Sequence, residues 1–225
     1  MNQKQWNQYL YSTHNPPSLT GTRLNEGDKI RQAEIKFVID NYLPDWNKAG
    51  KVLALGCGDG FEIGVFKDKG FNDVIGLTNH KDELLRQDII EGDMHDIPVE
   101  DKTFNYAYSK ETLEHSICPY IALCEINRVL KVGGEFMMLI STGMEKQRDT
   151  YHFSCFNDWI WYDLFRKAEL KVTKIIENDI QTGFIGVKLE DKDFEKLPVT
   201  RTSGRYSYTL REDLNGVPRS NLLFK

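Results

Sequence analysis

Apolar and polar residues follow two different periods along this chain. Between Asn25 and Tyr42, apolar residues recur at steps of three and four, which is typical of an amphipathic helix, and Pro44 is expected to end it. Short apolar runs then alternate with helix-like segments, an arrangement that favours one α/β domain. The expected strands begin near Lys51 and Ile90 and span Asn72–Thr78, Phe104–Ser109, Glu135–Thr142, Val172–Ile176 and Phe184–Leu189.

The chain between Lys51 and Gly60 predicts a strand, a tight turn and the start of a helix. Three glycines alternate in it, at Gly56, Gly58 and Gly60. Glycine permits positive φ and leaves the main chain open to a ligand, and the first N–H groups of the next helix favour nucleotide-like or anionic groups. A glycine-rich turn that only lets a strand and a helix pack closely is the alternative.

Composition narrows the class of partner. The 225 residues suit one well-filled domain, and the net charge of −5 argues against a general binder of nucleic acid, which needs a cationic face. The four cysteines form no C-x-x-C pair, so no zinc site or disulfide framework is indicated. We find no apolar run long enough to cross a bilayer and no signal peptide, and therefore expect a cytoplasmic protein without membrane association.

Three further segments that carry a recognisable pattern follow the glycine turn: Glu91–Pro98, then Glu111–Ser116, then Pro119–Gly134. With that turn they resemble the class I S-adenosylmethionine (SAM) dependent methyltransferases, in particular the small-molecule, type-11-like group. The resemblance runs from about Trp46 to Glu190. It implies a Rossmann-like three-layer α/β sandwich with a seven-stranded, mostly parallel sheet and one antiparallel strand. It also implies SAM as cofactor.

The resemblance assigns cofactor contacts to particular residues. The turn Gly56-Cys57-Gly58 with Gly60 would hold the amino-acid part of SAM, Asp93 and the N–H of Met94 would face adenine, and Ser109 would lie near the sulfur. An acceptor beside a donor complements the adenine edge, although Gly92-Asp93 could also be a simple turn.

Two positions depart from the family pattern. Thr78, with Asn79 beside it, stands where an acid usually binds the ribose hydroxyls, and Asn105 replaces a second acid. Neutral side chains give weaker hydrogen bonds than a carboxylate. Asp82 or Glu83 could reach back to compensate, or the fold could bind SAM without catalysing a reaction.

Transfer to a hydroxyl requires a proton acceptor, and histidine suits that role near neutral pH. His115 and His152 follow the fourth and fifth strands, where open α/β sheets gather ligands, and they are the candidate catalytic bases; a structural role is the alternative for each. No metal site is expected.

The predicted organisation has three parts: residues 1–45 form an arm and helix, 46–190 the SAM-binding domain and 191–225 an extension. In the arm, Trp6, Tyr9 and Tyr11 are candidates for a lid over the cofactor. The predicted reaction is methyl transfer to a small-molecule or sugar hydroxyl. A non-catalytic SAM or S-adenosylhomocysteine binding protein and an RNA-modifying methyltransferase are the alternatives, and a homo-oligomer is left open.

Overall fold

The computed structural model describes residues 26–43, 45–79, 86–142, 152–177, 181–189, 200–203 and 206–208. The chain divides between Val99 and Glu100 into two compact units. The candidate lid residues Trp6, Tyr9 and Tyr11, as well as Asp82 and Glu83, lie outside the described residues.

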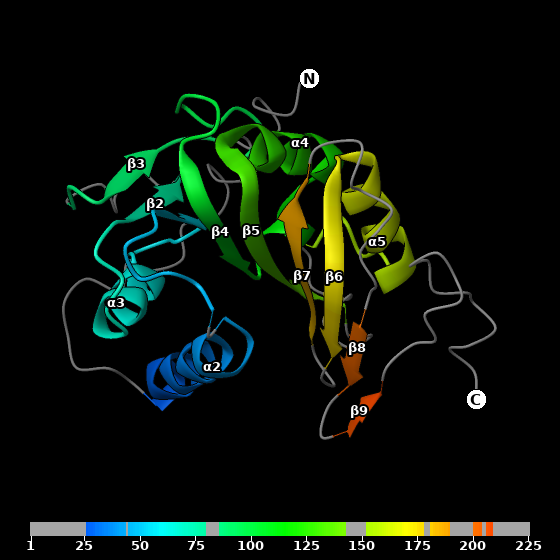
Figure 1. Cartoon of the computed structure of the whole chain (residues 1–225), viewed down its shortest axis with the longest axis horizontal. Helices are drawn as coiled ribbons and strands as arrows, with labels where there is room; N and C mark the ends of the chain where they lie inside the picture. Colours follow the sequence, from blue (N-terminus) through cyan, green and yellow to red (C-terminus); the bar gives the residue numbers. More distant parts are fainter. Residues whose placement is uncertain are drawn as a thin grey trace. The chain divides into compact units, whose positions relative to one another are not determined.

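The described residues of the first unit form three parallel strands and two helices (Figure 1). The strands are β1 (Val52–Leu55), β2 (Val74–Thr78) and β3 (Ile89–Glu91), and they lie in the order β3-β2-β1. Helix α2 (Glu26–Tyr42) coincides closely with the predicted helix and packs against α3 (Phe61–Asp68). All of β1 is buried, as expected for a central parallel strand.

Three aromatic rings fix α3 in the first unit. The ring centroid of Phe66 on α3 lies 5.2 Å from that of Phe71 and 6.3 Å from that of Trp46. All three side chains are buried. Because buried aromatic rings supply much of the apolar area of a small core, this cluster holds the helix that follows the glycine turn in a fixed position.

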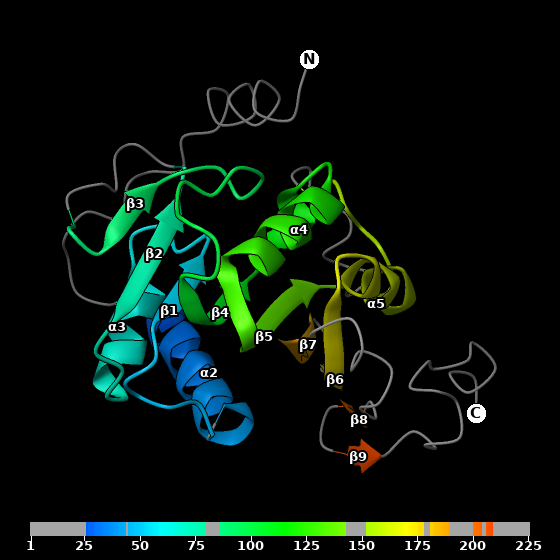
Figure 2. The ribbon, with the colours of Figure 1, turned by 45° about the horizontal axis from the view of Figure 1, so that its top comes forward.

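The second unit contains a mixed sheet (Figures 1 and 2). β4 (Phe104–Lys110) pairs in parallel with β5 (Leu130–Ser141), and β7 (Gln181–Lys188) runs antiparallel to both β5 and β6 (Leu170–Glu177). β8 (Thr200–Ser203) then pairs in parallel with β6, and β9 (Tyr206–Tyr208) pairs antiparallel with β8. The described helices of this unit are η2 (Leu113–His115), α4 (Pro119–Val129) and α5 (Asp158–Lys167).

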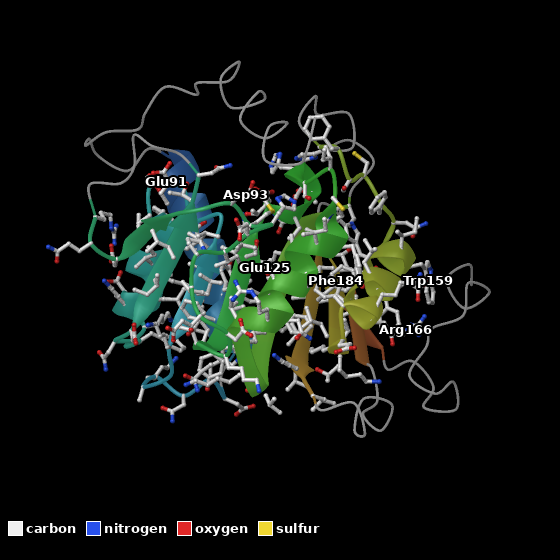
Figure 3. The ribbon with its side chains drawn as sticks, turned by 90° about the horizontal axis from the view of Figure 1, so that it is seen from above. Glu91, Asp93, Glu125, Trp159, Arg166 and Phe184 are labelled. Atoms are coloured by element: carbon white, nitrogen blue, oxygen red, sulfur yellow. The ribbon has the colours of Figure 1, made fainter. Side chains whose placement is uncertain are left out.

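Aromatic packing joins α5 to this sheet. The ring of Phe165 stacks on Phe136 at a centroid distance of 5.3 Å and lies 5.0 Å from Phe184 of β7, which Figure 3 labels beside α5. Asn157 caps α5 by accepting a hydrogen bond from the Ile160 N–H at 3.0 Å. α5 also contacts α4.

The α/β fold class is confirmed, and the seven expected strands correspond to β1–β7, with β7 as the antiparallel one. Two details differ from the sequence prediction. β5 begins at Leu130 rather than Glu135, because residues 130–134 form an irregular stretch of strand in which Gly133 has φ 78°. β8 and β9 lie in a segment where the sequence pattern predicts no strand.

None of the helices in the described part of the chain combines the length and apolar character needed to span a membrane.

Candidate cofactor and acceptor site

Glycine shapes the turn between β1 and α3. Gly56, Gly58 and Gly60 have φ values of 69°, 51° and 82°, in the left-handed region that favours glycine. The N–H groups of Gly56 and Cys57 both donate to the Leu77 carbonyl of β2, at 2.9 and 3.1 Å. The turn is therefore tied to the neighbouring strand just beyond the carboxyl end of β1.

The side chain of Cys57 points away from the open side of this turn. It is 1% exposed, and a Cβ added to Gly76 of β2 would lie 2.4 Å from its Sγ. Gly56 is exposed and Gly58 half-buried. At Gly56 and Gly58 the turn thus presents main chain rather than side chain to solvent, which fits the amino-acid end of SAM as the family resemblance describes it.

Arg86 holds the far end of the turn, a role that the sequence pattern did not reveal. Its Nη1 donates to the Gly60 carbonyl at 3.3 Å, while Nε and Nη2 donate to the two carboxylate oxygens of Asp88, each at 2.9 Å. Hydrogen bonds from Arg86 hold the pKa of the Asp88 carboxyl well below its usual value. A Cβ on Gly60 would lie 2.9 Å from Ile89 Cδ1, so glycine is also required here for space.

The candidate ribose and adenine residues follow β2 and β3. Thr78 ends β2 and is 5% exposed, and its carbonyl accepts a hydrogen bond from the Gly92 N–H at 2.9 Å; Asn79 is half-buried. Among the described residues 74–79, the end of β2 carries no carboxylate, which agrees with the departure from the family pattern seen in the sequence.

Asp93 lies in a tight turn, closed by the Asp96 N–H, which donates to the Asp93 carbonyl at 3.0 Å. Figure 3 labels Asp93 near Glu91 in the segment after β3. Its Oδ1 accepts from the His95 N–H at 3.0 Å and lies 2.5 Å from His95 Nδ1. Met94 is half-buried in the same turn. The backbone here is therefore a tight turn, as the alternative interpretation of Gly92-Asp93 expected. Within this turn, His95 orients the Asp93 carboxylate that is assigned to adenine.

In the second unit, the carboxyl end of β4 carries Ser109. Its side chain is 2% exposed, and its hydroxyl has no hydrogen-bond partner within the described parts of the chain. Glu111, two residues later, has φ 50°, although its N–H still pairs with the Leu139 carbonyl of β5 at 2.9 Å. A non-glycine residue in this conformation stores strain and often marks a functional position.

The structure brings the two candidate bases together. The ring centroids of His115 and His152 lie 4.8 Å apart, at an interplanar angle of 71°, and both side chains are half-buried. Glu114 connects their segments, because its carbonyl accepts from the N–H groups of Phe153 and Ser154 at 2.9 and 3.0 Å. The same segment holds Cys155, whose thiol pKa is raised by burial and by Glu114.

Glu111 and Glu114 were not among the candidate catalytic or cofactor-binding residues, although the family resemblance places Glu111 near the reacting sulfur. The E-x-x-E-H spacing of residues 111–115 was visible, but the spacing alone did not show which carboxylates turn inward. Among the described residues, no three His, Cys, Asp or Glu side chains form a group suited to holding a metal ion.

Comparison with known proteins supports a methyltransferase domain in the part of the chain that carries the glycine turn. Residues 53–138 match a family model described as a methyltransferase domain. YrhH of Bacillus subtilis (strain 168), which is named as a methyltransferase, is 36% identical over 77 residues, covering 34% of this chain and 42% of YrhH. The chain thus spans less than half the length of the curated relatives it matches.

Solved structures show the same fold. The PH0226 protein from Pyrococcus horikoshii OT3 has a TM-score of 0.63 and 21% identity, covering 80% of this chain and 98% of that one. Geranyl diphosphate methyltransferase, solved in complex with SAM, has a TM-score of 0.61 and 12% identity, covering 72% of this chain and 86% of that one. The family model thereby confirms the methyltransferase resemblance over residues 53–138, and the solved structures confirm the fold.

Proposed function

We propose that this chain, whose residues 53–138 match a methyltransferase domain, transfers a methyl group from SAM to a hydroxyl of a small molecule or sugar. The observation that carries the proposal is the open main chain at Gly56 and Gly58, with the Cys57 side chain buried behind it. A turn that served only close packing would not require exposed, positive-φ glycines on its solvent side.

Cofactor binding divides among three segments of the first unit. The main chain from Gly56 to Gly60 binds the amino-acid end, Thr78 and Asn79 bind the ribose, and Asp93 with the Met94 N–H binds adenine. The family resemblance also assigns Ser109 to the methionine part, and that assignment stays a prediction. Because Thr78 and Asn79 are neutral, we expect the ribose to contribute less affinity than it does where a carboxylate accepts both hydroxyls.

When bound, SAM would supply a methyl carbon activated by its bond to the sulfonium sulfur; transfer to the acceptor oxygen would break that bond and release S-adenosylhomocysteine. The chain must hold the acceptor oxygen close to that carbon and accept its proton. His152 accepts the proton, and His115, whose ring lies against it, either orients His152 or shares the role.

The proposed SAM-binding domain comprises residues 46–190, and the protein acts in the cytoplasm. The proposed acceptor is a small molecule. The net charge of −5 supports this acceptor class over RNA. Two neutral residues favour the rival of a non-catalytic SAM or S-adenosylhomocysteine binding protein: Thr78, and Asn105, whose Oδ1 accepts a hydrogen bond from Lys131 Nζ at 3.0 Å.

A methyl-release screen with SAM over sugars, small acids, amines and RNA tests the proposal. Turnover on a sugar or other small hydroxyl compound is expected, and His152→Ala should lower it roughly 100-fold while leaving SAM binding intact. Turnover on RNA alone would refute the acceptor class. SAM binding without turnover on any pool would favour the binding protein.

A further inference from the structure

Polar side chains gather at the carboxyl ends of β4 and β5 in the second unit. We call Lys110, Glu111, Glu114, Ser141 and Gln181 the carboxylate cluster. Ser141, the last residue of β5, joins its two acids: the main-chain N–H donates to Glu114 Oε1 at 2.8 Å, and Oγ donates to Glu111 Oε1 at 3.3 Å. Open α/β sheets bind their ligands at this edge.

Gln181 fixes the position of the Glu111 carboxylate. It lies opposite Ser141 in the β5–β7 pairing, is 9% exposed, and donates from Nε2 to Glu111 Oε1 at 2.7 Å. The Glu111 side chain itself is 33% exposed. A carboxylate that is held in place from the sheet side and is still open to solvent can meet a ligand without losing much rotamer entropy.

Glu114 gives an independent indication of a ligand. Its side chain is 0% exposed, and its Oε2 has no hydrogen-bond partner among the residues that the structure describes. Burying a carboxylate oxygen without a donor is costly, so such groups usually have a partner supplied by something else. The buried and unpartnered hydroxyl of Ser109, on the same strand end, gives a second indication.

The charges of the cluster determine what that partner can be. The cluster contains two carboxylates and one ammonium group, Lys110 Nζ, which lies 3.7 Å from Glu111 Oε2. Ser141 and Gln181 are neutral, and the side chain of each donates a hydrogen bond to Glu111 Oε1. A ligand that brings O–H or N–H donors can satisfy these oxygens, whereas a second anion would be repelled by them.

We propose that the carboxylate cluster is the acceptor subsite and that Glu111 selects, by accepting a hydrogen bond, acceptors that present hydroxyl or amine donors over carboxylates and phosphates. The inference rests on the proposed methyltransferase function and gives its acceptor a chemical class. It makes Glu111 a specificity-determining residue distinct from the histidine that takes the proton.

Methylation of matched acceptors tests this inference. Each neutral polyol or amine is paired with the acid that differs from it by one group, such as glucose or glucosamine against glucuronate. We expect the wild type to favour the uncharged or amine member by about tenfold or more in kcat/KM. In Glu111→Gln the preference should shrink to within about threefold, with SAM affinity unchanged.

Glu169→Gln is the matched control. Glu169 is also a glutamate with positive φ, at 58°, but it is exposed in the turn after α5. Its substitution should leave the preference as in the wild type. A wild-type preference for acids, an unaltered preference in Glu111→Gln, or SAM binding without methylation of any donor overturns the inference. A wild type that does not bind SAM refutes the proposed function itself, and the inference falls with it.

Discussion

The guanidinium of Arg86 joins the Gly60 carbonyl, 3.3 Å from Nη1, to the Asp88 carboxylate, which it meets at 2.9 Å. One side chain therefore fixes the end of the glycine turn to the segment that leads into β3. Lys67 of α3 adds a second cation, with its Nζ 2.5 Å from Asp88 Oδ2. The conformation of the turn thus depends on Lys67, 7 positions after Gly60, and on Arg86, 26 positions after it.

Removing this contact should loosen the turn. Arg86→Ala is expected to lower the free energy of unfolding by about 1 kcal/mol, because the Arg86 side chain is partly exposed, and to weaken SAM binding. Urea unfolding and calorimetry measure the two effects. Arg166→Ala is the control, since Arg166 meets Asp163 at 3.4 Å on the exposed surface of α5. Equal changes in the free energy of unfolding and in SAM affinity in the two variants would show that Arg86 does not hold the turn.

The pH dependence of stability should report on Asp88. Its pKa is lowered in the folded protein, chiefly by hydrogen bonds from Arg86, so its stabilising effect is complete above the unfolded carboxyl pKa of about 3.9. The effect is lost as pH falls below that value. Urea titrations at pH 6 and pH 3 should show a smaller loss of stability on acidification in Asp88→Asn than in the wild type. Equal losses would contradict the assignment.

Strain at Glu111 predicts a conflict between stability and activity. Glu111→Gly relieves a residue with φ 50° but also removes the acceptor of hydrogen bonds from Ser141 Oγ and Gln181 Nε2, so any gain in the free energy of unfolding should stay well below about 1 kcal/mol while turnover falls. Glu169→Gly, at φ 58° and exposed, should raise the free energy of unfolding by up to about 1 kcal/mol and leave turnover unchanged. Thermal unfolding and the methylation assay measure both. A Glu111→Gly protein with wild-type activity would show that the strain serves no function.

Much of the fold was predictable from local sequence signals. The glycine turn was found because positive φ is a local demand of Gly56, Gly58 and Gly60, and α2 was found from its period of three to four residues. β8 and β9 were missed because their polar sequence gives no strand pattern and their pairing depends on β6, which is distant in sequence.

The site was predicted less completely than the fold. His115 and His152 were selected by residue type and position, and the structure places them side by side. The hydrogen bonds from Ser141 and Gln181 that organise Glu111 and Glu114 could not be predicted, because they join residues 27 to 70 positions apart. Arg86 was missed for the same reason, since no short motif links it to Gly60.

The adenine assignment predicts a difference between two acids of one turn. Asp93→Ala should weaken SAM binding about tenfold, because it removes the acceptor assigned to the adenine amino group and the group that orients His95. Asp96→Ala should leave the affinity within about twofold, because the Asp96 side chain is exposed and the turn is closed by the main-chain N–H of Asp96, which the substitution keeps. Calorimetry with SAM compares them, and equal affinities would remove Asp93 from the site.

Calorimetric titration of SAM into the wild type, Gly58→Arg and Gly64→Arg tests the central claim most directly. Gly64 lies on α3 with open space around its Cβ position, so its substitution adds the same side chain outside the turn. We predict micromolar binding to the wild type and Gly64→Arg and none to a folded Gly58→Arg protein. A wild type that does not bind SAM at tens of micromolar, or a Gly58→Arg protein that binds equally well, would contradict the account.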